Sequence, residues 1–248
     1  MSRTAPLLVL LSLSVTTPLY AACDDPPAPQ VNWSGCHKEG IDLSGVDLRG
    51  AIMKRAHLQG ANLSGARLNG TDFSFADLEG ADLRGARMNE SRLLSANLNR
   101  VNLAAAQMVG VRLDRTKLQQ ANMAKTNLSG ATLYQSDLRQ ANLEEAQLQE
   151  AQMKQANLDE ANLIKANLEE ADLYLASLER ATLTGANLHK ARLEKSNLYY
   201  ADLSNTNLQR ASLVDAELFE TRFEGSVMGG ALWVNRKRCR NDSKDTCE

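Results

Sequence analysis

Residues 121–163 read ANMAKTNLSGATLYQSDLRQANLEEAQLQEAQMKQANLDEANL, with Leu or Met at every fifth position from 123 onward. The same register runs from Leu43 to Met228 as 38 consecutive Leu, Met or Phe residues, with no insertion or deletion. Two residues before each of them stands a small or β-branched residue, and it is Ala in 25 of the 38 repeats. A register kept this long describes a whole architecture, not a single element.

The five-residue period fits neither common secondary structure. On an α-helix, successive apolar residues would step by about 140° and wrap around every face. On a flat strand they would alternate between the two sides. A coiled coil or an Ala/Leu-rich helical bundle needs a different period, so both are excluded. One short extended piece and one turn per pentapeptide remain, which predicts a solenoid with coils about 4.8 Å apart.

A 20-residue subperiod predicts four sides per coil. Steps of 20 from Asp42 give Asp or Asn at eight of nine positions, whereas steps of 20 from Ile52 give only two. We number the sides by one coil, 41–45, 46–50, 51–55 and 56–60, and each recurs once in every later coil. The 38 repeats then make about nine and a half coils and a rod roughly 45 Å long. Glycine follows Leu by two residues on the first and second sides but never on the third, so we expect different turn types at the corners.

Individual repeats such as Ala61-Asn62-Leu63-Ser64-Gly65 and Ala81-Asp82-Leu83-Arg84-Gly85 match the consensus A(N/D)LXX. Over residues 41–228 the chain therefore resembles the pentapeptide-repeat family. This resemblance implies an all-β fold, a right-handed quadrilateral β-helix over residues 41–230, with about 9–10 coils of about 20 residues each. Trp33-Ser34-Gly35-Cys36 is similar to the entry of secreted family members, which carry Cys-containing end caps.

The two ends of the chain indicate an extracytoplasmic protein. Residues 1–22 read as a secretory signal peptide, with Arg3, an apolar stretch over 7–15 and small residues before Cys23. The apolar stretch is too short to span a bilayer permanently, so we expect no transmembrane helix in the mature chain and a secreted or periplasmic location. Residues 23–40 should form an N-terminal linker and cap, and 231–248 a C-terminal cap with a disulfide loop.

The four cysteines lie outside the repeats, two at each end. A disulfide needs Cα atoms within about 7 Å, whereas the rod holds its ends roughly 45 Å apart. The architecture therefore permits only Cys23–Cys36 and Cys239–Cys247 within one chain. The alternative for Cys23 is a lipid anchor, but Tyr20 is a poor fit to a lipoprotein box and lipidation would leave Cys36 unpaired.

Trp33 and Trp233 stand in the repeat register at the two ends, each beside a cysteine loop. End coils of a solenoid leave apolar side chains and strand edges uncovered. We interpret the two tryptophans as structural end caps, in preference to a ligand site.

No constellation for catalysis, cofactor binding or metal binding is visible in the sequence. The histidines are His37, His57 and His189, and the last two fall about seven coils apart on different sides. No phosphate-binding loop, nucleophile elbow or Cys-x-x-Cys motif occurs. The sequence thus predicts a protein that is not an enzyme and that has no cofactor and no metal site.

The outer surface carries the remaining functional signals. Residues 84–125 hold eight basic residues against two acidic ones, and residues 144–179 hold nine acidic residues against two basic ones. Such bands could steer a charged partner, although they more often keep a long surface soluble. Outward aromatic and aliphatic residues on the third and fourth sides form a predicted interaction patch: Tyr174, Leu175, Tyr199, Tyr200, Val214 and Phe219.

Three classes of function follow, and the first is favoured. It is a non-catalytic extracytoplasmic scaffold that binds an unidentified protein partner or a second copy of itself. The second is a DNA mimic that inhibits a topoisomerase, as some family members do, but the signal peptide and near-balanced charge oppose it. The third is an enzyme with an unusual site. Direct binding of nucleic acid is also disfavoured, because the net charge is −2 and the basic band contains no aromatic residues.

Overall fold

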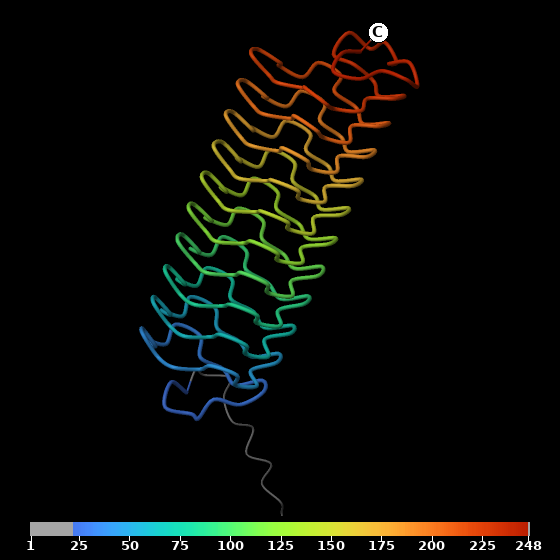
Figure 1. The fold of residues 1–248 in the computed structure, drawn as a ribbon. Coiled ribbons are helices and arrows are strands. Elements are labelled where there is room, and N and C mark those ends of the chain that lie inside the picture. The colour runs from blue at the N-terminus through green and yellow to red at the C-terminus, as the bar shows by residue number, and fades with distance from the viewer. Residues whose placement is uncertain (1–21, 248) are drawn as a thin grey trace, which may run out of the picture.

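The computed structural model describes residues 22–247, which wind into a stack of similar coils that forms a rod (Figure 1). Parallel β-bridges pair residues 20 positions apart, from Asn32 with Ile52 to Ser212 with Leu232. Each side of a coil contributes a single bridged residue, and residues 22–247 contain no helix. In particular, none of these residues forms a helix long and apolar enough to cross a membrane. The predicted signal segment, 1–22, lies outside the described residues except for its last position.

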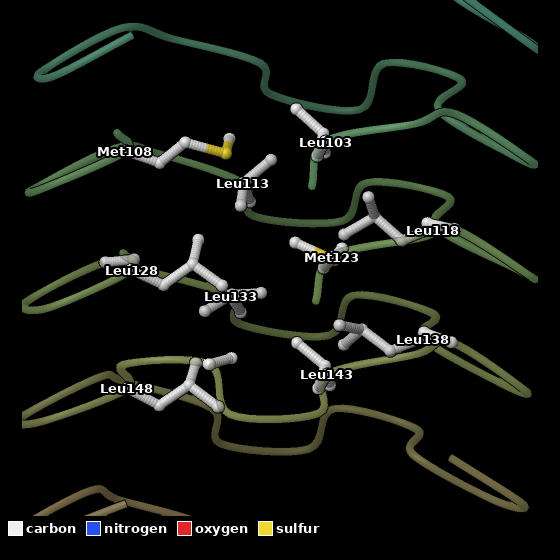
Figure 2. Close-up of a cluster of buried hydrophobic side chains, with 14 of the residues drawn as sticks. Leu103, Met108, Leu113, Leu118, Met123, Leu128, Leu133, Leu138, Leu143 and Leu148 are labelled. Carbon is white, nitrogen blue, oxygen red and sulfur yellow. The ribbon is translucent and has the colours of Figure 1, made fainter. Parts of the chain in front are cut away.

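The interior of the rod is a continuous column of the fifth-position side chains. Figure 2 shows Leu and Met residues of successive coils pointing into the same core. Of the 38 such residues, all are buried except Leu218 and Phe223, which are half-buried in the last coil. The preceding Ala residues fill the space between them, because only a small side chain fits beside the large ones at the density of a protein interior. Where Thr or Ser replaces Ala, its hydroxyl donates to a backbone carbonyl, as Thr71 does to Leu48 at 2.9 Å.

All 38 corners share one backbone conformation. The residue two positions after each Leu has a φ between 53° and 74°, whether it is one of 12 glycines or one of 26 other residues. The next amide donates to the Leu carbonyl, as Ala61 does to Leu58 at 3.0 Å, which closes a turn of type II geometry. The expectation of different turn types at the corners is therefore wrong. None of the 26 is Val, Ile or Thr, because β-branched residues resist positive φ.

The Asn and Asp residues before Leu connect the coils. On the first side Asn62 donates to Asp42 at 2.9 Å, and Asn162 donates to Asn142 at 3.1 Å. The same carboxyl and amide oxygens accept a hydrogen bond from the backbone N–H two residues later. Asp42, for example, accepts from the Ser44 N–H at 3.0 Å. These bonds hold the turn and the neighbouring coil together, so the ladder has a structural role.

Candidate interaction surfaces

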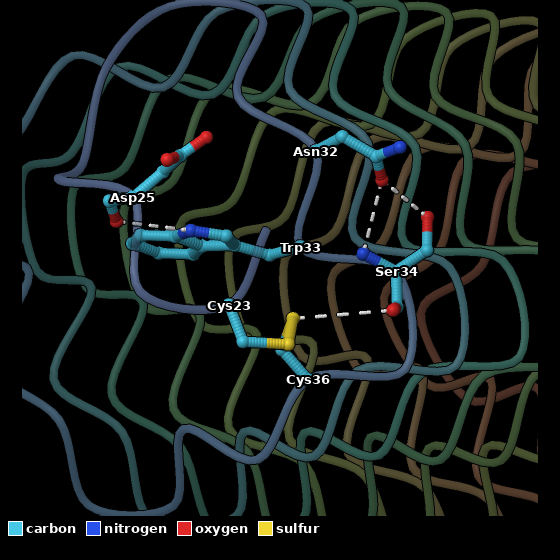
Figure 3. The surroundings of a disulfide bond; sticks show 6 residues. All are labelled: Cys23, Asp25, Asn32, Trp33, Ser34 and Cys36. Atoms are coloured by element: carbon cyan, nitrogen blue, oxygen red, sulfur yellow. Dashed lines mark hydrogen bonds between the residues drawn. A yellow bond between two sulfur atoms is a disulfide. The ribbon is translucent and has the colours of Figure 1, made fainter. Parts of the chain in front are cut away.

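The N-terminal cap is built around Trp33, which is only 1% exposed. Its indole N–H donates to the Asp25 carbonyl at 3.3 Å, and the Lys38 ammonium lies 4.7 Å from the ring centroid. Cys23 and Cys36 form a disulfide with Cα atoms 5.4 Å apart, and Figure 3 shows this bond near the indole. Trp33 is therefore enclosed at the N-terminal end of the rod, and its role as an end cap stays a prediction.

The C-terminal cap is less complete. Cys239 and Cys247 are bonded, and antiparallel bridges join Val227 to Lys244 and Leu232 to Arg238. The last coil comprises residues 216–235, and the returning chain covers its second and third sides, 226–230 and 231–235. Trp233 is only half-buried, with its ring 5.4 Å from that of Phe223. The fourth and first sides of this coil stay partly open, which exposes apolar surface at one end of the rod.

Three residues of the predicted patch form one aromatic cluster beside this open end. Phe219 packs edge-on against Tyr200, with centroids 5.5 Å apart, and against Tyr199 at 5.9 Å. Phe219 is 55% exposed and Tyr200 45%, and the Arg180 guanidinium lies 5.2 Å from the Tyr200 ring. We call Tyr199, Tyr200 and Phe219 the aromatic cluster. Leu218 continues it into the open end coil.

The other three patch residues lie on a different corner of the rod. Tyr174 and Leu175 are in the turn after the third side, and Val214 occupies the same register two coils later. Among the described residues, no ring contact joins Tyr174 to the aromatic cluster, and Tyr174 instead lies 5.8 Å from the Lys195 ammonium. The structure thus brings together half of the predicted patch, and whether the other half serves the same partner stays a prediction.

Sequence reasoning missed a groove on the third side. Two adjoining hollows of about 350 and 380 Å³ share Phe75, Leu94 and Arg112. Phe75 is 56% exposed, and the Arg55 guanidinium lies 5.6 Å from its ring. The remaining lining residues combine positive charge with Tyr134: Lys54, Asp72, Ser74, Arg92, Ser95, Asp114, Arg115 and Tyr134.

This groove corrects the interpretation of the basic band. No aromatic residue lies within residues 84–125, but Phe75 and Tyr134 line the same groove as Arg112. Phe75 lies two coils before Arg112, and Tyr134 lies one coil after it. Part of the positive charge is compensated, since Asp72 lies 3.4 Å from Lys54 and 3.8 Å from Arg92. The groove could have been predicted from aromatic and basic residues that stand about one coil apart in the sequence, such as Arg55 and Phe75 or Arg112 and Tyr134.

Several surface carboxyls of the rod have a lowered pKa, which favours their charged form. The Arg49 side chain donates to Asp47 at 2.9 and 2.8 Å and lowers the pKa of that carboxyl to about 2. Burial raises the pKa of Asp137, but hydrogen bonds from Arg139 and Gln119 outweigh it, so the pKa is lowered. A carboxyl that serves as a general acid requires the opposite shift. These pairs stabilise the surface of the coils instead.

The fold defines a β-solenoid protein, and comparison with known families gives the particular kind. The model described as pentapeptide repeats matches eight overlapping copies that together span residues 41–232. This is well over half of the chain, so the protein belongs to the pentapeptide repeat family. The copies cover 41–80, 66–104, 96–135, 106–144, 126–163, 136–173, 161–198 and 196–232. No curated protein matches the chain.

Solved structures similar to this one include pentapeptide repeat proteins. HetL, involved in heterocyst differentiation regulation in the cyanobacterium Nostoc sp. strain PCC 7120, is 29% identical over 81% of this chain and 92% of its own, with a TM-score of 0.51. A protein of the Arabidopsis thaliana thylakoid lumen is 32% identical over 35% of this chain and 61% of its own, with a TM-score of 0.35. QnrB1, a plasmid-mediated fluoroquinolone resistance protein, is 20% identical over 78% and 91%, with a TM-score of 0.42.

Proposed function

We propose that this protein is a non-catalytic scaffold outside the cytoplasm, a right-handed four-sided β-helix that presents a fixed contact surface to a protein partner. The two disulfides support the location, because such bonds persist in oxidising compartments. A signal peptide over residues 1–22 would direct the chain to such a compartment and would then be removed. The bond between Cys23 and Cys36 argues against a lipid anchor, since lipidation would consume the Cys23 thiol.

The observation that carries this proposal is the exposed aromatic cluster. Phe219 and Tyr200 keep about half of their surface in solvent while they pack against each other. Clusters of this kind tend to mark interfaces. Their backbone belongs to bridged coils, so little conformational freedom would be lost on binding. The adjacent half-buried Leu218 and Phe223 extend the apolar area, and a second copy of the chain is the first partner to test.

The test replaces the two most exposed members of the cluster. Tyr200→Ala combined with Phe219→Ala should weaken association about 30-fold, the effect of a loss of about 2 kcal/mol at an interface hot spot. Phe75→Ala is the matched control, because Phe75 is equally exposed but lies in the groove. Light scattering reports the mass of the protein, and chemical cross-linking in the cell envelope reports other partners.

The outcomes separate the alternatives. A dimer that dissociates only in the double variant supports self-association through the cluster. A monomer that loses specific cross-links only in the double variant supports a different protein partner. If mass and cross-links are the same in wild type and double variant, the cluster is not the contact surface.

DNA mimicry is a poorer account of this surface. A mimic must present a dominant negative face, whereas the third-side groove gathers Arg55, Arg112 and Arg115 around Phe75. A DNA gyrase supercoiling assay with the purified protein should show no inhibition. Inhibition at stoichiometric protein would favour the mimic over the scaffold.

A further inference from the structure

Two histidines and a glutamate meet on the fourth side, next to the N-terminal disulfide. His37 and His57 are bridged neighbours in adjacent coils, and their rings stack with centroids 4.2 Å apart and planes inclined by 9°. The Glu39 carboxylate lies 2.8 Å from Nδ1 of His37. One ligand atom from each of the three side chains can be chosen so that all lie within 4.8 Å of one another.

This cluster overturns the basis on which the sequence predicts no metal site. That prediction rests on the separation of His57 and His189 and leaves His37 out. His57 follows His37 by one full coil, so the solenoid places the two side by side. The 20-residue subperiod is the signal that could have revealed the pair.

We propose that His37, His57 and Glu39 bind one divalent transition-metal ion such as Zn²⁺ or Cu²⁺. Each imidazole would supply one ring nitrogen and the carboxylate one oxygen, with water in the remaining positions. Two imidazoles and one carboxylate are a common ligand set for such ions, which bind at about 2.0–2.2 Å. Ligands of a tetrahedral ion at those distances are about 3.3 Å apart.

The geometry needs only small side-chain movements to reach that arrangement. The backbones are already fixed, because Lys38 N–H donates to the His57 carbonyl at 2.8 Å and His57 N–H donates to the Cys36 carbonyl at 2.9 Å. His37 and Glu39 are exposed and His57 is half-buried, so the rings can rotate out of the stack until their lone pairs converge. Closure of the ligand atoms from at most 4.8 Å to about 3.3 Å lies within such rotations.

The neighbouring charged side chains leave the site open to a cation and add no fourth protein ligand. Lys38 does not compete with an ion, since its ammonium lies over the Trp33 ring. Asp77, the next residue on the same ladder, is bridged to His57 but accepts from Gln59 at 2.7 Å and from Asn97 at 3.0 Å. These two hydrogen bonds hold the Asp77 carboxylate away from the proposed metal site.

The chain contains a matched control for this site. His189 Nδ1 lies 3.0 Å from the Glu169 carboxylate of the preceding coil, so it also pairs one imidazole with one carboxylate, although His37 and Glu39 make their contact within one coil. Among residues 22–247, three potential ligand side chains come this close together only at His37, Glu39 and His57, and the His189 pair lacks a second imidazole. A site built from two imidazoles should therefore bind an ion where the His189 pair does not.

The experiment titrates the untagged protein, with both disulfides formed, with ZnCl₂ and separately with CuSO₄ in a non-chelating buffer. Calorimetry should show one equivalent bound by wild type and by His189→Gln. His37→Gln and His57→Gln should lose this binding, and Glu39→Gln should weaken it about 10-fold to 100-fold. In NMR spectra, substoichiometric Cu²⁺ should broaden the ring signals of His37 and His57 and spare those of His189.

Several results would overturn the proposal. These are no one-equivalent binding of either ion by wild type, binding that persists in His57→Gln, and equal loss in His189→Gln. Circular dichroism of each variant establishes that the coils are intact, which is expected because all the replaced side chains lie on the surface. MgCl₂ and CaCl₂ serve as further controls, since these hard cations prefer oxygen ligands and should not bind.

Discussion

Replacing Glu150 by Gly should stabilise the protein, although it removes a side chain and introduces no new contact. Glu150 sits at a corner with a φ of 58°, and no side-chain hydrogen bond or ion pair within residues 22–247 involves it. Left-handed backbone conformation costs a residue with a Cβ about 1–2 kcal/mol, and glycine avoids that cost. Gly130 holds the same corner one coil earlier, with a φ of 65° and no atom within 4 Å of the point where a Cβ would stand.

The gain is partly offset in the unfolded chain. Glycine has more conformational freedom to lose on folding, which costs about 0.5–1 kcal/mol. The net stabilisation should therefore be about 0.5–1 kcal/mol, or about 2 °C in the melting temperature of a chain of this size. Glu144→Gly is the matched control, since it removes the same charge from the same region at a corner position where φ is not positive. It should destabilise the protein by about 0.5–1 kcal/mol.

Urea unfolding followed by circular dichroism gives both free energies, and Glu150→Gln corrects for the loss of charge. Glu150→Val supplies a test in the opposite direction, because a β-branched residue is least tolerant of positive φ. The reasoning fails if Glu150→Gly and Glu144→Gly shift the urea midpoint in the same direction. It also fails if Glu150→Val is as stable as wild type.

Three further predictions concern the caps and the surface ion pairs. Gly229→Ala would place a Cβ 2.5 Å from the Asn241 backbone oxygen, so the C-terminal cap should detach and become sensitive to trypsin, and protection equal to wild type would contradict this. Cys239→Ser with Cys247→Ser opens a loop of eight residues and should cost the cap about 2.5 kcal/mol, measured as faster hydrogen exchange of cap amides with the repeats unchanged. Because the pKa of Asp47 is lowered, its charged form contributes stability above the ordinary value of 3.8, and this stability is lost as the pH falls towards about 2. Over this pH interval, the melting temperature of Asp47→Asn should therefore fall less than that of wild type.

The column of fifth-position residues could be predicted from the sequence because burial in a solenoid is a local matter. A Leu points inward if its own pentapeptide forms one extended residue and one turn. Leu133 is buried in this way. The disulfide pairing followed from the length of the rod. The common corner conformation was missed, although the absence of Val, Ile and Thr from corner positions such as Phe75 and Glu150 indicated it.

The surfaces were harder to predict, because they depend on which side chains the coils bring side by side. Tyr200 and Phe219 fall almost one full coil apart in the sequence, yet they are packed edge-on. Tyr174, which the sequence assigned to the same patch, lies instead on another corner beside Lys195. Position along the rod was therefore readable from the sequence, whereas contact between corners depended on side-chain direction.

The sequence by itself determined the period of the rod, its core and the pairing of its cysteines. Each of these depends on a pattern that repeats with the backbone and is insensitive to any one side chain. Only the tertiary structure showed that the C-terminal cap leaves Phe223 half-covered, that Phe75 and Arg112 share a groove, and that His37 stacks on His57. These features bring together residues about one or two coils apart, and their geometry is set by rotamers and chain ends, which a five-residue repeat does not specify.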